Sequence, residues 1–225
     1  MGSLVEMTDS PTPSERARGL AANAHRLPAG VYVVTGGLLA FVVAGTSVGL
    51  IRETLHFNCS WGVGGEWGPN GTWVCADGIG YLNAAITIGG VSALFLAIGL
   101  LTAVTAPSLT RSITYLALAL TSVAWIGWWT YFGATFYTGP RPAGETGISV
   151  WAATVLPGVA LSALGLMAGA FGALGALRTR RQADIALACG VGLILIGTAI
   201  QPGIGVATFV AAGLLAAAGS RTPAH

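Results

Sequence analysis

Charged side chains are missing from four long stretches of this sequence. Residues 30–51, 81–106, 112–133 and 150–177 contain no Asp, Glu, Lys, Arg or His. Each stretch reaches the roughly 20 residues that a helix needs to cross a bilayer core of about 30 Å. Only 8% of the chain is charged, whereas a soluble domain carries roughly 25%. The sequence therefore predicts an all-α, polytopic integral membrane protein.

The same lack of charge excludes several functions. Proton relays, ion-coupled transport and catalysis inside a bilayer use ionisable side chains within the membrane. The three histidines are dispersed along the chain, so a haem or copper site has no ligand set. The net charge of +2 is small and spread over the loops, which excludes a nucleic-acid partner, because that would need a clustered basic patch. We expect no cofactor, no metal site and no enzymatic activity.

Proline, glycine and charge divide the chain into a transmembrane domain between two tails. Residues 1–28 form a polar cytoplasmic N-terminal tail, residues 29–219 the transmembrane domain, and residues 220–225 a cytoplasmic C-terminal tail. Gln201-Pro202-Gly203 interrupts the last apolar stretch and predicts a turn between two helices, although one broken span over 182–219 is an alternative. The expected helices cover about 30–52, 81–106, 112–134, 150–177, 182–201 and 203–219, with an outer loop at 53–80.

The arginines predict the orientation of these six helices. All ten basic residues are arginine, which together with 34 glycines is typical of a GC-rich bacterial genome. A cytoplasmic N-terminus places eight arginines inside and only Arg52 and Arg141 outside. Cytoplasmic loops carry such an excess of basic residues. We therefore expect a bacterial plasma-membrane protein with both termini in the cytoplasm and three hairpins that open outward.

Two cysteines lie in the outer loop. Cys59 and Cys75 flank 15 residues on the side that the arginines place outside the cell. Cysteines in an oxidising compartment form disulfides, and closing a loop of this length adds roughly 3 kcal/mol to stability by the chain-entropy model. Cys189 has no partner and is expected to pack as a small apolar residue.

All seven tryptophans fall toward the outer face. An interfacial belt is one explanation, because an indole ring combines an apolar body with a polar tip. The loop tryptophans exceed what a belt requires, so contact with a lipid or a partner is the alternative. Three lie in the outer loop, at Trp61, Trp67 and Trp73, and four at outward-facing helix ends, at Trp125, Trp128, Trp129 and Trp151.

A small polar cluster follows the first predicted helix. If the helix continues, Glu53 and His56 share one face at spacing i, i+3. With Asp77 they could form an acid–base pair or a metal site, although a metal needs a third ligand at the right distance. The other interpretation is a solvated helix end.

Small residues recur every four positions along three predicted helices. Such stripes let helix backbones approach closely in lipid. They serve packing inside one bundle, or association with further copies or another membrane protein. Pro157-Gly158 predicts a kink near the outer end of its helix. The stripes are Gly36, Ala40 and Ala44; Ala85, Gly89, Ala93 and Ala97; and Gly165, Gly169 and Ala173.

These patterns favour a non-catalytic cell-envelope protein over a catalyst. The expected role is an accessory, assembly or stabilising subunit. It would contact membrane lipid, and another membrane protein or further copies of itself, through the tryptophan loop and the outer aromatic cap. A carrier or channel for a neutral or lipidic molecule is the first alternative. An enzyme that uses Glu53 and His56 is the second.

Overall fold

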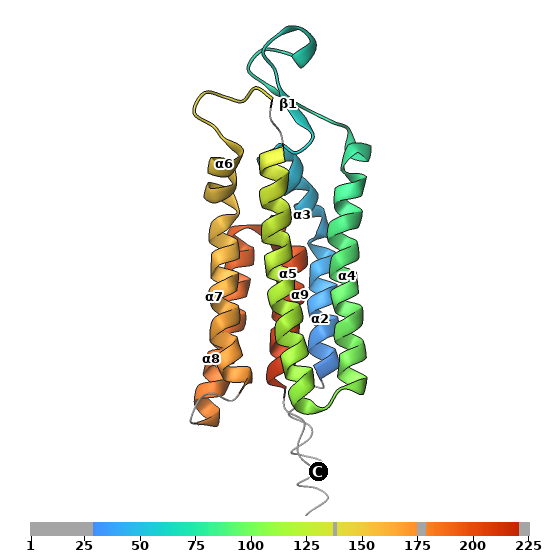
Figure 1. The fold of residues 1–225 in the computed structure, drawn as a ribbon, viewed down its shortest axis with the longest axis vertical. Helices are drawn as coiled ribbons and strands as arrows, with labels where there is room; N and C mark the ends of the chain where they lie inside the picture. Colours follow the sequence, from blue (N-terminus) through green and yellow to red (C-terminus); the bar gives the residue numbers. More distant parts are fainter. Residues whose placement is uncertain (1–28, 137–138, 175–178, 221–225) are drawn as a thin grey trace, which may run out of the picture.

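The computed structural model describes residues 29–136, 139–174 and 179–220, so the predicted tail at 1–28 and all but Ser220 of the predicted tail at 220–225 lie outside them. The described chain is an elongated helical bundle with a β-hairpin at one end, here called the hairpin end (Figure 1). The α-helices are α2 (Ala29–Val42), α3 (Ala44–Gly49), α4 (Leu82–Thr105), α5 (Ser108–Phe136), α6 (Gly147–Thr154), α7 (Leu156–Ala173), α8 (Arg180–Ile200) and α9 (Gly205–Gly219). The shorter elements are a π-helix, η1 (Leu50–Thr54), the 3-10 helices η2 (Gly65–Trp67), η3 (Gly78–Tyr81) and η4 (Pro202–Ile204), and the strands β1 (Cys59–Trp61) and β2 (Trp73–Cys75).

The bundle has the dimensions and apolar character of a membrane domain. Five of the described helices are long and apolar enough to cross a bilayer. A sixth candidate consists of α2 continued by α3 and η1, with a bend of 50° between its two parts. The all-α class is thereby confirmed, and the helices indicate a membrane protein.

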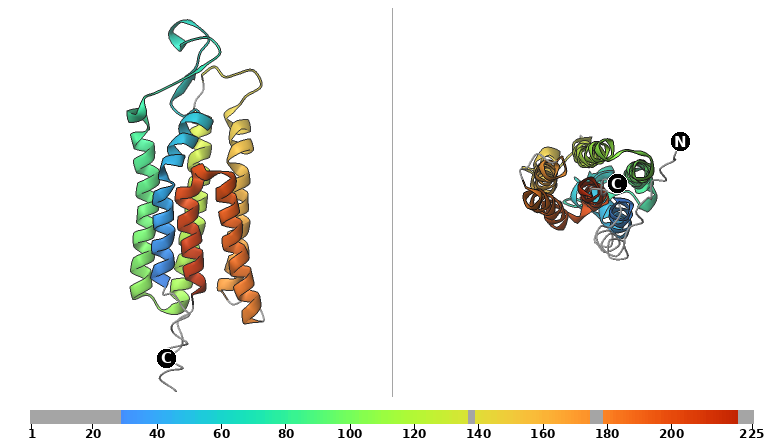
Figure 2. Two further views of the ribbon diagram at one scale, coloured as in Figure 1. Left: turned by 180° about the vertical axis from the view of Figure 1, so that it is seen from behind. Right: turned by 90° about the horizontal axis from the view of Figure 1, so that it is seen from below.

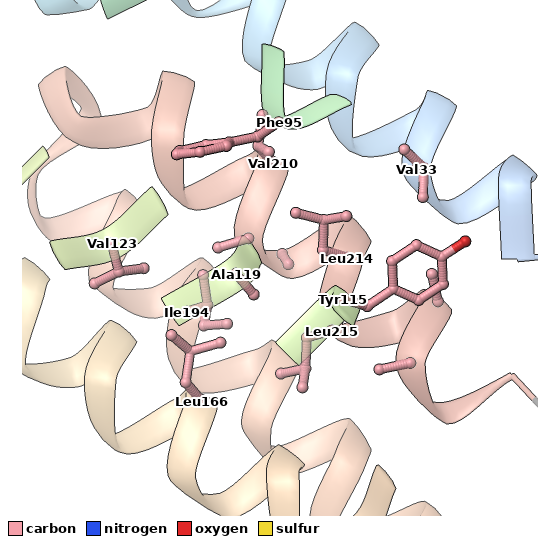
Figure 3. Packing of buried hydrophobic residues seen from close by; sticks show 14 of the residues in the cluster. Val33, Phe95, Tyr115, Ala119, Val123, Leu166, Ile194, Val210, Leu214 and Leu215 are labelled. Carbon is pink, nitrogen blue, oxygen red and sulfur yellow. The ribbon is translucent and has the colours of Figure 1, made fainter. Parts of the chain in front are cut away.

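Helix α9 forms the axis of the bundle, and the other helices surround it, as the end-on view in Figure 2 shows. Of the 18 residues in η4 and α9, 78% are buried, whereas 22–33% of the most apolar 18 residues are buried in each of the other four long helices. The helix is built almost entirely of Ala, Gly, Val and Leu. Its small side chains let several neighbours approach at once. Larger side chains, among them Tyr115, Phe95 and Ile194, fill the space between the helices (Figure 3).

Glycines allow the closest helix contacts. A Cβ atom on Gly36 of α2 would lie 2.6 Å from the Phe209 carbonyl oxygen of α9, and one on Gly190 of α8 would lie 2.5 Å from the Gly165 carbonyl oxygen of α7. The stripe that contains Gly165 therefore packs inside the bundle, as do Gly36 and Ala40 of the first stripe, whereas Ala44 is exposed. The α4 stripe differs, because Ala85, Gly89 and their partners Ala93 and Ala97 are exposed on the outer surface.

Hydroxyl groups from the neighbouring helices bind the backbone or side chains of α9. Ser122 Oγ donates to the Ala207 carbonyl at 3.0 Å, and Ser112 Oγ donates to the Ala218 carbonyl at 2.9 Å. The hydroxyls of Thr198 and Thr208 lie 2.6 Å apart. Such interhelical hydrogen bonds supplement van der Waals packing where water does not drive association.

Helices α8 and α9 are joined by η4 before they reach the hairpin end of the bundle. Helix α3 and η1 lie across this connection (Figure 2). Thr46 Oγ1 lies 2.7 Å from the Val43 carbonyl oxygen and 2.8 Å from the Pro202 carbonyl oxygen, either of which can accept its hydrogen bond. Leu50 packs against Gly203, whose added Cβ would meet the Leu50 Cβ at 2.3 Å. The first predicted helix, at 30–52, is therefore interrupted at Val43, because a side chain inserted into the helical ladder bends it over the turn.

The helix predicted at 150–177 is also divided. Helix α6 ends at Thr154 and α7 begins at Leu156, so the interruption lies just before Pro157. Proline removes one helical hydrogen bond and clashes with the preceding turn, which explains the position of the break. Gly158 then approaches the Gly197 carbonyl of α8, from which an added Cβ would lie 2.9 Å.

Candidate functional site

A disulfide joins Cys59 and Cys75 across the β-hairpin, which confirms the predicted bond. The strands β1 and β2 are antiparallel, with Cys59 opposite Cys75 and Trp61 opposite Trp73. Beyond the strands, the Gly62 amide donates to the Thr72 carbonyl at 2.8 Å, which continues the ladder. Cys189 is a free, exposed cysteine.

Trp73 connects the two loops at the hairpin end. The His56 imidazole stacks on the Trp73 ring at a centroid distance of 4.1 Å and an interplanar angle of 8°. Trp61 meets the same ring edge-on at 5.3 Å. The Arg141 guanidinium, from the loop between α5 and α6, lies 5.9 Å from the ring centroid and donates to the Ala134 carbonyl at 2.9 Å. Trp61 and Trp73 thus contact other residues of the hairpin end, whereas the Trp67 side chain lies outside the described part.

The residues of the predicted polar cluster, Glu53, His56 and Asp77, do not form one site in the structure. The π-helix ends at Thr54, and His56 has a left-handed backbone with φ of 53°. Glu53 and His56 therefore do not continue one helical face. The Asp77 carboxylate accepts a hydrogen bond from the Gly80 amide at 3.4 Å and caps η3. Among the described residues, no group of three His, Cys, Asp or Glu side chains is placed to hold a metal ion.

His56 offers a titratable probe of the hairpin end. Burial lowers its pKa below the ordinary value of about 6.5; the Glu145 carboxylate opposes this and the Arg141 charge adds to it. The folded state therefore binds fewer protons than the unfolded state just below pH 6.5, so acidification through this range destabilises the folded hairpin end.

We expect NMR of histidine-labelled protein to show the His56 imidazole titrating at a pH below the ordinary value of about 6.5. Replacing Trp73 by Ala exposes the ring and should move its midpoint upward. A His56 midpoint at or above 6.5 in the unmodified protein would contradict the burial of this side chain.

Four aromatic side chains form a ladder along the outer surface of α5. Trp125, Trp128, Phe132 and Phe136 follow one helix face, and successive ring centroids lie 5.5, 5.8 and 5.4 Å apart. Trp128, Phe132 and Phe136 are 57%, 47% and 64% exposed. We call these four residues the aromatic ladder. Its upper end meets Phe57 of the outer loop, whose ring lies 6.3 Å from that of Phe136.

The remaining tryptophans of the predicted cap lie elsewhere. Trp151 Nε1 donates to the Thr130 hydroxyl at 3.0 Å, and its ring meets Tyr131 edge-on at 5.4 Å. These contacts pin α6 to α5. The Trp129 ring lies 6.0 Å from Phe57. The four tryptophans of the predicted cap therefore have three different positions: Trp125 and Trp128 belong to the aromatic ladder, Trp151 joins α6 to α5, and Trp129 lies beside Phe57.

The groove beside Trp129 has a volume of about 280 Å³ and lies between α4 and α5, beneath the outer loop. Its lining contains three uncharged polar side chains and no charged one. Hydropathy alone did not single out this set as a site, because its members are far apart in the sequence and each is common in a membrane helix or loop. The lining residues are Phe57, Asn58, Gly80, Asn83, Ala84, Thr87 and Trp129.

One pattern typical of hydrolases occurs in the sequence, and the described structure places its serine in a short helix. Residues 45–49 read Gly-Thr-Ser-Val-Gly, and in hydrolases the Gly-x-Ser-x-Gly pattern places its serine on a sharp turn between strand and helix. Here the segment is helix α3, and Ser47 is only 4% exposed. The cavity of about 70 Å³ beside Ser47 is lined by Ala, Val, Ile and Gly and by no ionisable side chain. No base in this cavity can activate the hydroxyl.

Comparison with family models, with curated proteins and with solved structures gives no match for this chain.

Proposed function

We propose that this protein is a non-catalytic accessory, assembly or stabilising subunit that docks against another membrane protein through the aromatic ladder. The observation that carries the proposal is the exposure of Trp128, Phe132 and Phe136 on one face of α5. Trp73 and Trp151, at the same end of the bundle, contact other parts of the chain. The ladder presents a large, rigid aromatic surface of the kind that dominates protein interfaces.

The length of the ladder favours a protein contact over an interfacial belt. From Trp125 to Phe136 the helix rises about 16 Å at 1.5 Å per residue. The polar layer on each side of a bilayer is only about 5–8 Å thick. The ladder therefore extends into the hydrocarbon region, where a belt has no role. Phe132 and Phe136 also lack the polar tip that makes Trp and Tyr favourable at the interface.

We also propose that the chain crosses the bacterial plasma membrane six times and that its hairpin end lies outside the cell. Arg111 lies in the first turn of α5, and Arg180 and Arg181 begin α8, at the end opposite the hairpin. The hairpin end carries Arg52 and Arg141. This asymmetry agrees with an excess of basic residues on the cytoplasmic side. The disulfide at the hairpin end agrees with an oxidising compartment there.

Two features bear on the alternative roles. Helix α9 occupies the bundle axis, so a carrier or channel would have to use the lateral groove between α4 and α5 instead of a central path. Ser47 has no ionisable neighbour in its cavity, and Asp77 is used as a helix cap. Both observations favour a binding role over an enzyme. The exposed small-residue stripe of α4 offers a second surface on which further copies could pack.

Photocross-linking in the native membrane tests the docking face. A photoreactive phenylalanine analogue at position 132 should give one protein adduct of defined mass, whose identification distinguishes a second copy from another chain. The matched probe at Leu120, an exposed residue (58%) lower on the same helix, should give lipid adducts only.

A second test places the probe at Tyr131, an exposed site adjacent to the ladder. Combined replacement of Trp128, Phe132 and Phe136 by Ala should abolish the protein adduct formed from this position. Replacement of Leu109, Ile113 and Leu120 by Ala serves as the control, because these side chains are equally exposed on the other half of α5. Equal lipid labelling from positions 132 and 120, with no protein adduct, would reject docking on the ladder.

A further inference from the structure

The groove between α4 and α5 has the composition of a small-molecule site. Phe57 and Trp129 supply two aromatic walls with ring centroids 6.0 Å apart and an interplanar angle of 52°. Asn58, Asn83 and Thr87 supply the polar groups. Binding sites typically combine an apolar or aromatic lining with a few polar groups that orient the ligand.

The two asparagine amides are available to a ligand. Among the described residues, neither the Asn58 nor the Asn83 side chain has a hydrogen-bond partner, whereas Thr87 Oγ1 donates to the Asn83 carbonyl at 2.7 Å. A side-chain amide both donates and accepts, so the pair can bind carbonyl and hydroxyl groups. Both asparagines are exposed, so a molecule in the groove can reach their amides.

The disulfide hairpin positions one of these amides. Asn58 has a left-handed backbone with φ of 58°, a conformation that asparagine tolerates better than most residues. Its carbonyl accepts a hydrogen bond from the Ala76 amide at 3.0 Å. Cys59 and Cys75, the residues adjacent to this hydrogen bond, carry the disulfide. The outer loop thus holds the Asn58 side chain over the groove.

The lining also determines the charge and size of the occupant. It contains no Asp, Glu, Lys, Arg or His, so a charged group would be desolvated there without a counter-charge. Its volume of about 280 Å³ matches a head group and not a whole lipid. The exposed apolar side chains of α4, among them Leu82 and Ile86, leave room for a tail along the outside of the bundle.

We propose that this groove binds the uncharged, carbonyl-bearing head group of a membrane amphiphile, with its carbonyls on the Asn58 and Asn83 amides and its flat face against Trp129. Two membrane components offer this chemistry: the ring of a prenylated quinone and the ester region of a neutral glycerolipid. The site is independent of the docking face, because a ligand in the groove does not require a protein on the ladder.

Fluorescence titration of the full-length protein in nanodiscs tests this site. The probes are decylubiquinone, whose ring quenches tryptophan fluorescence, and dioleoylglycerol as its competitor. We expect saturable quenching that Asn83→Ala weakens about three- to tenfold, as the loss of a hydrogen bond to a neutral group predicts. Asn58→Gly should have a similar effect while it preserves the left-handed backbone. Asn70→Ala, in the exposed hairpin tip, is the matched control and should leave binding unchanged.

The competitor distinguishes the two sources. Displacement of decylubiquinone by dioleoylglycerol assigns the site to the lipid ester, and failure to displace it assigns the site to a quinone ring. Quenching that does not saturate, or that is equal in the Asn58, Asn83 and Asn70 variants, would overturn the proposal. Formation of the Cys59–Cys75 disulfide and an unchanged helical circular-dichroism spectrum verify that each variant is folded.

Discussion

Replacing Gly190 by Ala is expected to destabilise the bundle by about 1–3 kcal/mol, the typical range for overpacking. The added Cβ would lie 2.5 Å from the Gly165 carbonyl oxygen and 2.8 Å from the Gly169 amide nitrogen of α7. All these neighbours are backbone atoms, so no side-chain rotation relieves the clash and α7 must move away from α8. Reversible unfolding in mixed micelles, followed by circular dichroism, measures the loss.

Gly192→Ala is the matched control for this change. Gly192 lies two residues further along α8, and no atom lies within 4 Å of the position that its Cβ would take. The same substitution there should be neutral or slightly stabilising, because alanine favours a helix more than glycine. Equal stability of the two variants would mean that α7 and α8 do not cross at Gly165 and Gly190.

Replacing both Cys59 and Cys75 by Ala is expected to reduce the free energy of unfolding of the hairpin end by roughly 3 kcal/mol, the chain-entropy value for a loop of this length. The bond holds Trp73 against His56 and Asn58 over the groove, so its loss should loosen both. We expect faster proteolysis within residues 62–72 and weaker binding in the groove. Cys189→Ala removes the free cysteine and should change neither property.

Chemical labelling of the same cysteines tests the orientation of the protein. After reduction of intact cells, a membrane-impermeant maleimide should modify Cys59 and Cys75, and without reduction it should not. Labelling that requires permeabilised cells would place the hairpin end in the cytoplasm.

Unchanged proteolysis after replacement of both Cys59 and Cys75 by Ala would show that the β-hairpin holds the loop without the disulfide.

The predicted helices follow from apolar stretches and their interruptions, which are local properties. The stretches 81–106 and 182–201 correspond to α4 and α8, and the break before Pro157 follows from the missing backbone donor of proline. The bend at Val43 has no such local signal. It depends on Thr46 binding the Pro202 carbonyl, a contact between residues far apart in the chain.

The candidate site was predictable only in part. Tryptophan positions pointed to the hairpin end, and the predicted outward placement of the loop pointed to the disulfide. The sequence could not separate Trp128, which is exposed, from Trp129, which lines a groove, because adjacent residues on a helix point in different directions and both directions are apolar in a membrane. The Asn58 and Asn83 amides come together only because the outer loop folds back over the start of α4.

By itself, the sequence predicted helices long and apolar enough for a membrane protein and a disulfide between Cys59 and Cys75, because length, hydropathy and cysteine spacing are local properties. Only the tertiary structure decided which helix lies at the axis. The last apolar stretch resembles the others in hydropathy, yet its Ala and Gly residues let α2, α5 and α8 approach it simultaneously. Lipid-facing and buried helices are both apolar, so steric fit between helices, and not hydrophobicity, selects the central one.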